Sequence, residues 1–418
     1  MRGPRKYIYD PIHGSIPLAG AVLDSMNHPL LQRLWGIRQT GLAHLVFPGS
    51  GHSRLEHSLG AMWVARAMAS SLGMDEGARE AVELAGLLHD IGHPPFSHSL
   101  EGALVESTGR NHEMWTLDLV RGKVAESFRS HWAREDAPEP PTLPEILERH
   151  GIGVKEVTGL LGPRLPVRQR PIGEMLHGTI DADRLDYMER DAHYTGVAHG
   201  AIDSNRLLET LRVAGNHLAF AEKGRSAVEG FLVARSLMYA SVYYNKTVRV
   251  AESMILSALE RLPGYPGVAP RLLGMNDGEL LGALTASGGR ARSIALRIRV
   301  RDLYKRAVTL PPTVPHRRIA VRLGRDPILR RQAEDAIAEA LDAAPGDVLI
   351  DTIAGPSTPD DDVTIVDRNR TYRLLAEDPP LAHLVHRSPT RWCVALYGIP
   401  RLRGDLERRG ERLLTDAL

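Results

Sequence analysis

The sequence predicts a mainly α-helical fold: a helical core followed by a smaller C-terminal α+β unit. Apolar residues recur at helical spacing between glycine and proline breaks through most of the first 260 residues, which favours helices. After about residue 311 the pattern changes to short apolar runs separated by turn residues, which favours strands. The chain contains no internal repeat and no coiled-coil heptad. We therefore expect two domains, a helical domain at 1–310 and an α+β unit at 311–418.

The helices of the first domain are delimited by capping residues and by glycine or proline. Asp75 can cap one helix, which Gly92, Pro94 and Pro95 bring to an end. Residues 1–24 are expected to be irregular or extended, because glycine and proline punctuate them. Helices are predicted at 53–72, 75–89, about 97–107, about 111–121, 143–150, 173–191 and, as the longest pattern, 225–261.

The C-terminal unit is expected to mix strands with helices. The predicted elements are strands at 318–323, 347–351 and 392–397, a hairpin of 363–366 with 371–374, and helices at 326–343 and 400–417.

Composition excludes several classes of protein. The chain is 43% hydrophobic and 25% charged, as is usual for a globular protein and unlike a disordered or collagen-like chain. Its 52 basic residues nearly balance 51 acidic ones, so the net charge is +1. No global field attracts nucleic acid or membrane, and any anion site must therefore be local.

The single cysteine, Cys393, excludes an internal disulfide and a cysteine-based metal cluster. The first residues contain no apolar segment of the kind found in secretory signals. No uninterrupted apolar run approaches the length of about 18 residues needed to span a membrane. We expect a cytoplasmic protein without a membrane partner.

The sharpest motif is a histidine–aspartate pair at the end of an apolar helix. His89 and Asp90 are followed within nine residues by His93 and His98, and the intervening glycine and prolines can turn the chain back toward the same cleft. Neutral imidazole together with carboxylate suits a divalent transition ion. The pair therefore predicts part of a metal site.

Two further segments place chemical groups on helix faces. Arg54 and His57 lie three residues apart, on one face of a helix. Asp183, Tyr187 and Asp191 recur at every fourth residue and share another face. Asp186 and Arg190 share a different face of the same segment, where we expect a solvated ion pair.

Together these motifs resemble the HD-domain phosphohydrolases. Within that superfamily they are similar to the dNTP triphosphohydrolase branch, which includes the SAM-and-HD-domain dNTPases of animals. The resemblance covers most of residues 1–260 in order and is only general beyond about residue 310. It rests on Asp10–Gly14, Val46–Gly49, His52–Gly60, His89–His98, Asn111–Glu113, Asp181–Gly196 and, more faintly, Ala234–Lys246.

The resemblance implies roles for individual residues. It implies a divalent metal (manganese, iron, zinc or magnesium) held by His57, His89, Asp90 and Asp183. It implies that His98 and His112 lie near the scissile phosphate, that Glu113 orients His112, and that His93 faces the phosphates. It further implies that a triphosphate is held by Arg54, Arg184, Arg235 and Lys246, and a sugar by Gln39, Tyr187, Asp191 and Tyr243.

The sequence also departs from the family pattern. Thr40 stands where these dNTPases carry a leucine against the ribose 2′ face, so exclusion of ribonucleotides is expected to be weaker. Arg184 replaces a lysine, and Asn245 replaces a histidine that usually precedes Lys246.

The resemblance implies hydrolysis of a dNTP to the deoxynucleoside and inorganic triphosphate, by attack of water at the α-phosphorus. It also implies a homo-oligomer, either a dimer or a tetramer. Two alternatives stay open: an HD phosphohydrolase for another phosphate ester, such as a ribonucleotide or a nucleoside monophosphate, and a nucleotide- or nucleic-acid-binding regulator. The arginine cluster at 289–306 is expected to form an amphipathic face, with a nucleic-acid-binding strip as the alternative.

Overall fold

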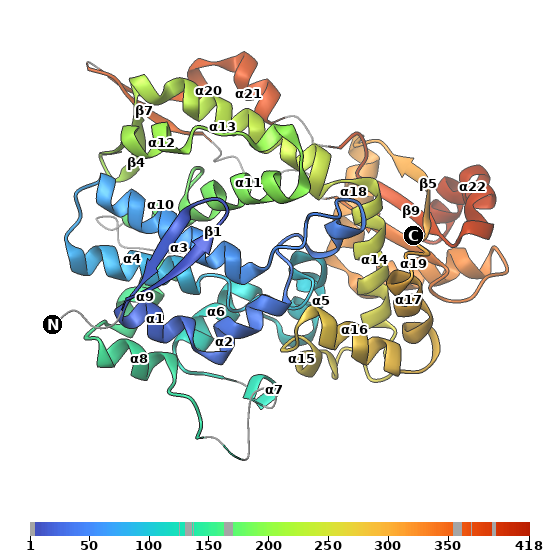
Figure 1. The fold of residues 1–418 in the computed structure, drawn as a ribbon. Helices are drawn as coiled ribbons and strands as arrows, with labels where there is room; N and C mark the ends of the chain where they lie inside the picture. Colours follow the sequence, from blue (N-terminus) through green and yellow to red (C-terminus); the bar gives the residue numbers. More distant parts are fainter. Residues whose placement is uncertain are drawn as a thin grey trace.

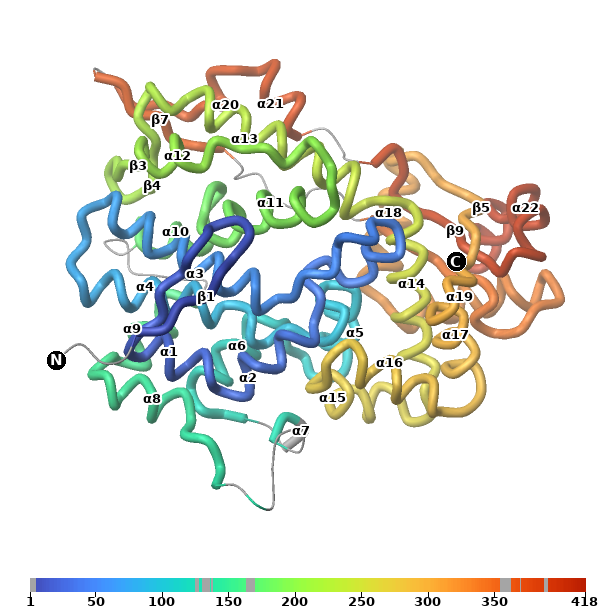
Figure 2. Tube along the Cα trace, viewed as in Figure 1, coloured from blue at the N-terminus to red at the C-terminus, as the bar shows by residue number. Residues whose placement is uncertain are grey.

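The computed structural model of the chain describes residues 5–124, 126–129, 136, 138–162, 170–353, 362–368, 370–386 and 390–418. Figure 1 shows a helical body and, beside it, a C-terminal unit with its own small sheet, and the trace in Figure 2 follows the same path. The predicted fold class, mainly α with a C-terminal α+β unit, is confirmed.

Three helices at the centre of the body carry or directly precede the four proposed metal ligands. The helix α3 (Arg54–Ser71) packs against both α4 (Glu76–Leu88) and α11 (Ala182–Thr195). Ser53 and Glu56 form a capping box that starts α3, and Asp75 caps α4, so the predictions at 53–72 and 75–89 are confirmed. Gly60 allows α3 to approach α11 closely, because a Cβ there would overlap the carboxylate of Asp186.

The single helix predicted at 173–191 is two helices in the structure. The first, α10 (Arg170–His177), ends before Gly178, and α11 begins after Asp181. The Asp181 carboxylate accepts a hydrogen bond from the Arg184 backbone N–H at 2.8 Å, which satisfies a free donor at the start of α11. This helix start presents Asp183 toward α3.

Shorter elements complete the body. The helices predicted at about 97–107, about 111–121 and 143–150 are confirmed as η3 with α5, α6 and α8. These elements are α1 (Gly20–Met26), α2 (Pro29–Gln32), η1 (Arg33–Gly36), η2 (Gly41–Leu45), η3 (Ser97–Leu100), α5 (Glu101–Thr108), α6 (His112–Val120), α7 (Glu126–Arg129), α8 (Leu143–Arg149), α9 (Val154–Leu161), η5 (Ala198–Gly200), α12 (Ser204–Thr210), η6 (Glu222–Gly224), α15 (Ala269–Leu272), α16 (Asp277–Ala286) and α17 (Gly289–Arg299).

The N-terminal segment, predicted as irregular or extended, forms a regular hairpin followed by a helix. Strands β1 (Lys6–Asp10) and β2 (Gly14–Leu18) pair antiparallel, and α1 follows them. The Asp10 carboxylate accepts hydrogen bonds from the backbone of Ile12 and His13, and Gly14 takes a φ of 72°. The aspartate and glycine of this turn are the local signal from which the hairpin could have been predicted.

The longest predicted helix, 225–261, is interrupted. The structure has α13 (Arg225–Met238), a π-helical segment η7 (Tyr239–Tyr243) and α14 (Lys246–Glu260), which Asn245 caps. Apolar periodicity alone does not register the wider turn, since it adds only one residue to the repeat. Tyr239 and Tyr243 of this segment line a cavity described below.

A four-stranded sheet covers α13 and joins distant parts of the chain. Its strands are β3 (Leu211–Ala214), β4 (His217–Ala221), β7 (Thr364–Val366) and β8 (Thr371–Arg373), in the order β3-β4-β7-β8. The pairing of β7 with β8 confirms the predicted hairpin, which also pairs in parallel with β4. Two helices follow, α20 (Leu374–Glu377) and α21 (Pro379–His386), and α21 packs on α13.

The C-terminal unit has a three-stranded sheet in the order β5-β9-β6, with α14 on one face and helices on the other. The predicted strand at 318–323 is wrong: these residues lie in α18, whose buried Ala320 and Leu323 are three residues apart. The other elements predicted here are confirmed, and the 310/311 domain boundary stays a prediction. The unit consists of β5 (Lys305–Leu310), α18 (Val314–Arg325), α19 (Pro327–Glu339), β6 (Val348–Thr352), β9 (Val394–Gly398), η8 (Pro400–Leu402) and α22 (Arg403–Asp416).

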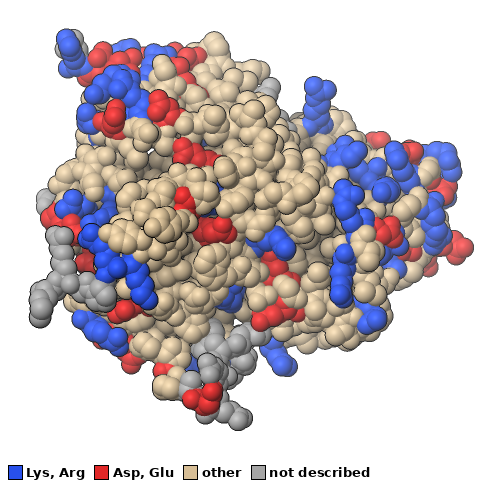
Figure 3. Space-filling view, viewed as in Figure 1, with Lys and Arg blue, Asp and Glu red and all other residues tan. Residues whose placement is uncertain are grey.

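The arginine-rich segment from residue 289 forms the amphipathic helix α17, as predicted. Ala291, Ile294 and Ile298 are buried, whereas Arg292 and Arg299 are exposed. Figure 3 shows lysine and arginine side chains gathered over this side of the molecule, around the C-terminal unit. Among the described residues, no helix is both long and apolar enough to cross a membrane.

Candidate active site and metal centre

A cleft between α3, α4, α11 and α14 consists of two adjoining cavities. The smaller cavity, of about 140 Å³, is lined by the histidine–aspartate motif, and the larger one measures about 420 Å³. Taken together, the two cavities have the volume that a small-molecule ligand occupies. The two cavities share the lining residues Gln39, Arg54, His98, Asp183 and Tyr187, so a single ligand can extend through both.

Four side chains from three helical segments converge in the smaller cavity. His57 Nε2 lies 3.2 Å from His89 Nε2 and 3.0 Å from Asp183 Oδ1, and His89 Nε2 lies 3.3 Å from Asp90 Oδ1. Donor atoms about 2.1 Å from one divalent ion stand about 3.0–3.4 Å apart in octahedral or tetrahedral geometry. These spacings therefore fit a shared divalent metal ion.

The tautomers of the two histidines support the same reading. His57 Nδ1 lies 2.7 Å from Asp186 Oδ2, and His89 Nδ1 lies 2.7 Å from the Gly86 carbonyl oxygen. Each acceptor holds a proton on Nδ1, which leaves the Nε2 lone pair directed at its neighbours. The Nε2 atoms of His57 and His89 and a carboxylate oxygen of Asp90 could together hold a metal ion. Its binding would displace the proton that His57 otherwise carries on Nε2.

The electrostatics of this cluster favour cations. Burial lowers the pKa of His57, but hydrogen bonds to Asp183 and Asp186 outweigh it and raise the pKa to about 10. Burial raises the pKa of Asp90, but the charges of Arg54 and His89 outweigh it and hold the pKa well below its usual range. Both carboxylates that face the cluster are therefore ionised at neutral pH.

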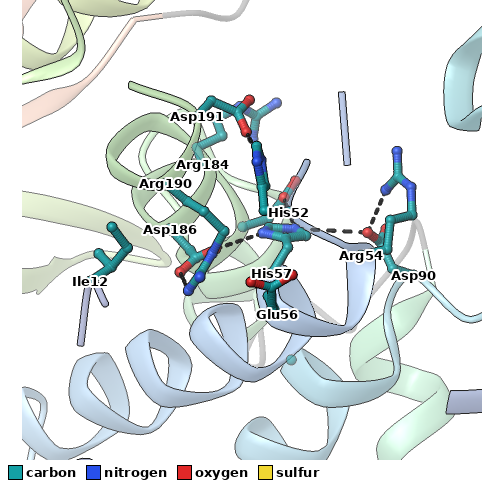
Figure 4. A network of polar contacts seen from close by, with 12 residues as sticks. Ile12, His52, Arg54, Glu56, His57, Asp90, Arg184, Asp186, Arg190 and Asp191 are labelled. Atoms are coloured by element: carbon teal, nitrogen blue, oxygen red, sulfur yellow. Dashed lines mark hydrogen bonds and ion pairs between the residues drawn. The ribbon is translucent and has the colours of Figure 1, made fainter. Parts of the chain in front are cut away.

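Asp186 and Arg190 belong to a buried network behind His57, not to the solvated ion pair that the sequence predicted. Arg190 donates to both oxygens of Asp186 at 2.9 Å and to Asp10 Oδ2 at 2.7 Å, while His13 Nε2 lies 2.6 Å from Asp186 Oδ1. Figure 4 shows Asp186 between His57 and Arg190. The network fixes the ring of His57 and links it to the N-terminal hairpin.

Arg54 lies between the histidine–aspartate motif and the larger cavity. It is 2% exposed, and its guanidinium donates to Asp90 Oδ2 at 2.5 Å and to Ser97 Oγ at 2.7 Å. Three of its five N–H groups stay available to a ligand in the cleft. Arg54 can thus neutralise a phosphate beside the metal cluster.

The turn that follows the motif is strained and well supported. Phe96 and Ser97 both adopt left-handed backbone angles, with φ of 56° and 57°, which non-glycine residues seldom do. Asp277 accepts from the Phe96 backbone N–H at 2.7 Å, and Ser97 Oγ donates to the Arg38 carbonyl oxygen at 2.8 Å. The turn brings His98 back to the same cleft as His93, as the sequence predicted.

Three histidines gather on the other side of Asp90. The ring centroid of His93 lies 5.0 Å from that of His98 and 3.9 Å from that of His112. His93 Nδ1 is 3.1 Å from Asp90 Oδ1, and its buried Nε2 has no hydrogen-bond partner among the described residues. This nitrogen is free to contact a ligand in the smaller cavity.

The carboxylate that holds two of these histidines is Glu101, not the predicted Glu113. Glu101 Oε2 lies 3.1 Å from His98 Nδ1, and Glu101 Oε1 contacts His112 Nδ1. Glu113 instead lies 3.4 Å from the Asn111 side chain, because adjacent residues on a helix point about 100° apart. The three-residue spacing from His98 to Glu101 was the signal that could have identified the pair.

The larger cavity carries the predicted sugar-binding residues. Asp191 Oδ2 accepts from the Tyr243 hydroxyl at 2.5 Å, and Asp191 Oδ1 lies 2.7 Å from His52 Nε2. Gln39 and Tyr187 line both cavities beside them. All four residues therefore line the larger cavity.

The predicted phosphate-binding residues do not all line the cleft. Arg184 lines the larger cavity while its guanidinium contacts Asp181. The Arg235 guanidinium lies 5.7 Å from the centroid of the Tyr239 ring, which itself lines that cavity. Lys246 is exposed at the start of α14, and it does not line either described cavity.

Comparison with known proteins places these features in a family. Residues 54–190 match the model of the HD domain, and residues 202–415 match the model of the HD associated region. An uncharacterized protein of Methanocaldococcus jannaschii is 32% identical over 403 residues, which cover 94% of this chain and 79% of that protein.

More distant similarities extend to proteins with named activities. Deoxynucleoside triphosphate triphosphohydrolase SAMHD1 of Gallus gallus is 28% identical over 293 residues, which cover 61% of this chain. The match spans 45% of that protein, less than half of its length. A phosphohydrolase from Bacteroides thetaiotaomicron has a similar structure, with a TM-score of 0.72 and 26% identity over 95% of this chain and all of that chain.

Proposed function

Because this chain belongs to the HD-domain phosphohydrolase family, we propose that it hydrolyses deoxynucleoside triphosphates to a deoxynucleoside and inorganic triphosphate. The observation that carries the proposal is the continuous cleft, in which a His/Asp cluster, arginines and a tyrosine–aspartate pair line adjoining cavities. A substrate that satisfies all three must combine phosphates with a hydroxyl-bearing group. A nucleoside triphosphate has this chemistry.

His57, His89, Asp90 and Asp183 would hold the divalent metal. When bound there, such an ion polarises a phosphoryl oxygen and lowers the pKa of water, to near neutral in favourable cases. Arg54 and Arg184 neutralise charge on the phosphates through forked N–H donors that match phosphate oxygens. Asp191 accepts a hydrogen bond from the sugar hydroxyl and fixes the position of C5′.

The histidine pair on Glu101 supplies the proton for the leaving group. As water forms a bond to the α-phosphorus and the P–O5′ bond breaks, the imidazolium of His98 or His112 donates its proton to O5′. Glu101 stabilises the protonated imidazole through Nδ1. Because a 5′-alkoxide is a poor leaving group, this proton is expected to accelerate the reaction by about 10²–10⁴-fold.

The proposal is tested by incubating the full chain with each dNTP and Mn²⁺ or Mg²⁺ and separating products by anion exchange. Released triphosphate supports it, orthophosphate indicates hydrolysis of another phosphate ester, and no product indicates a nucleotide-binding regulator. In ¹⁸O-water, label in the triphosphate and none in the nucleoside supports attack at the α-phosphorus. Label in the nucleoside would show that the C5′–O bond breaks instead.

A second candidate substrate is a ribonucleoside triphosphate. Thr40 lines the larger cavity, and its hydroxyl lies 2.6 Å from Ser50 Oγ, so this part of the wall is small and polar. A wall of this kind leaves room for a 2′-hydroxyl that a leucine would exclude. Turnover of the four ribonucleotides in the same assay tests this candidate directly.

We also propose that the chain assembles as a homo-oligomer, a dimer or a tetramer, since closed symmetric assemblies are common among enzymes. Light scattering with and without nucleotide tests it. A mass of about 46 kDa under both conditions would contradict the proposal.

A further inference from the structure

One wall of the larger cavity carries an acidic and a basic side chain that have no role in the proposed hydrolysis of the phosphate. Arg249 and Glu252 lie one turn apart on α14 and line the larger cavity but not the smaller one. Arg249 Nη1 donates to Glu252 Oε2 at 3.0 Å, and Ser99 Oγ donates to Glu252 Oε1 at 3.3 Å. We call this pair, Arg249 with Glu252, the far wall.

The C-terminal sheet holds the far wall rigidly. Arg249 Nε donates to Asp351 Oδ2 at 3.1 Å, and its Nη2 contacts Asp351 Oδ1. The Tyr397 hydroxyl in turn donates to Asp351 Oδ2 at 2.7 Å, and both Asp351 and Tyr397 are buried. The guanidinium therefore cannot rotate, and two of its five N–H groups are left for a ligand.

The Glu252 carboxylate likewise has hydrogen-bond acceptor sites left for a ligand. An ionised carboxylate offers about four lone-pair sites, and Ser99 and Arg249 occupy one on each oxygen. Its side chain is 19% exposed, and because Glu252 lines the cavity this exposure faces the ligand space. The far wall thus presents one donor group beside two acceptor oxygens.

Aromatic and apolar side chains line the space next to the far wall. Tyr244, Val248, Ala43 and Phe96 line the larger cavity there, and the helices η2 and η3 pack on α14 around it. Aromatic and apolar side chains of this kind stack on nucleobases regardless of base identity. Selection among bases is then left to the hydrogen bonds of the far wall.

We propose that the far wall selects guanine, which makes dGTP the preferred substrate of the proposed hydrolysis. The Watson–Crick edge of guanine presents, in order, the O6 acceptor, the N1–H donor and the N2 amino donor. Arg249 followed by the two Glu252 oxygens presents donor, acceptor, acceptor, which is the complementary order. This inference rests on the proposed function for its substrate class.

The other bases match the far wall less well. Adenine and cytosine place a ring-nitrogen acceptor beside their amino group, and that lone pair would face a Glu252 oxygen. Thymine has a single N–H between two carbonyl oxygens, one of which would face the carboxylate. Hypoxanthine keeps O6 and N1–H but lacks the N2 amino group, so it isolates the contribution of the second Glu252 oxygen.

The experiment compares kcat/KM for dGTP, dITP, dATP, dCTP and dTTP in the wild-type full chain and in Glu252→Gln. One bidentate pair to a base discriminates by about 10-fold or more, so dGTP should exceed the other substrates by that factor. Glu252→Gln should remove the preference by lowering dGTP turnover, since the amide replaces one acceptor oxygen with a donor that faces a guanine donor. Turnover of dATP should not fall with it, since the same donor can face the adenine ring nitrogen. Glu339→Gln, an exposed change on α19, is the matched control.

The outcomes separate this inference from the proposed function. Turnover of all dNTPs without a guanine preference, or a preference that Glu252→Gln leaves intact, would overturn the inference and keep the hydrolase. If no dNTP is turned over, calorimetry with deoxyguanosine and deoxyadenosine decides. Tighter binding of deoxyguanosine that Glu252→Gln abolishes would support the guanine site alone, and equal binding would overturn it. Circular dichroism confirms that the variant is folded.

Discussion

The two cavities of the cleft are held in place by different parts of the chain. At the smaller cavity three of the four proposed metal-facing side chains have a buried partner from the helical body: Asp186 behind His57, the Gly86 carbonyl behind His89, and Arg54 beside Asp90. The far wall of the larger cavity is held by Asp351 and Tyr397, which arrive on strands of the C-terminal unit. The metal-facing groups are thus supported by the helical body, and the far wall is supported by the C-terminal sheet.

The largest expected effect comes from removing proposed metal ligands at the smaller cavity. Replacing both His89 and Asp90 with alanine removes two of four proposed ligands and should abolish both bound metal and turnover. The far wall lies in a different cavity and is supported separately, so binding of deoxyguanosine should persist within about threefold. Metal analysis, the product assay and calorimetry measure the three quantities. His383→Ala, on the exposed side of α21, serves as the control. Stoichiometric metal in the double variant would refute the ligand assignment.

The next prediction concerns the role of Glu101 in holding His98 and His112. Glu101→Gln removes the charge that stabilises protonated His98 and His112, so kcat should fall by at least about 10²-fold while metal content stays unchanged. Steady-state rates and metal analysis measure the two quantities. A larger loss in Glu113→Gln than in Glu101→Gln would instead favour the original sequence prediction.

The division between the two cavities also explains which parts the sequence could predict. His57, the His89–Asp90 pair and Asp183 stand in short motifs with clear capping signals, so their helices could be anticipated. Their convergence was implied only by the family resemblance. Local periodicity misread α18 as a strand, because a short and largely apolar run fits both structures. It also missed the π-helical segment inside 225–261.

The far wall could not be predicted for a different reason. Arg249 is coupled to Asp351 across about a hundred residues, and no spacing rule connects a helix residue to a strand that follows so much later. The buried Asp186–Arg190 pair likewise looks like a surface ion pair until Asp10 and His13 are placed against it. In both cases the missing information is tertiary packing, which overrides local pattern.

A smaller effect is expected at Thr40, in the wall of the larger cavity. Thr40→Leu adds bulk beside the proposed 2′ position, so the ratio of ribonucleotide to deoxyribonucleotide kcat/KM should fall by about 10-fold, as one extra methylene-sized group can achieve. Thr40→Val keeps the size and removes only the hydroxyl that pairs with Ser50. A ratio that falls in Thr40→Leu but not in Thr40→Val shows that size decides. An unchanged ratio in both variants would mean that Thr40 does not face the sugar.

The last expected effect lies outside both cavities and concerns stability alone. It shows whether inactivation at low pH comes from catalysis or from folding. His28 caps α2 by accepting the Leu30 backbone N–H on Nδ1 at 3.1 Å, and burial lowers the pKa of His28 to about 4. The unfolded chain binds this proton near pH 6.5 and the folded chain does not. Stability is therefore complete above pH 6.5 and is lost as the pH falls toward 4.

At pH 5 this difference amounts to about 2 kcal/mol of unfolding free energy. In His28→Asn the side-chain oxygen can still cap the helix but does not titrate, so its stability should fall by about 2 kcal/mol less between pH 7.5 and pH 5. Denaturant unfolding at the two pH values measures the difference. Equal losses in both proteins would exclude His28 as the source. If the variant regains stability at pH 5 but its turnover still declines there, the decline does not come from loss of folding.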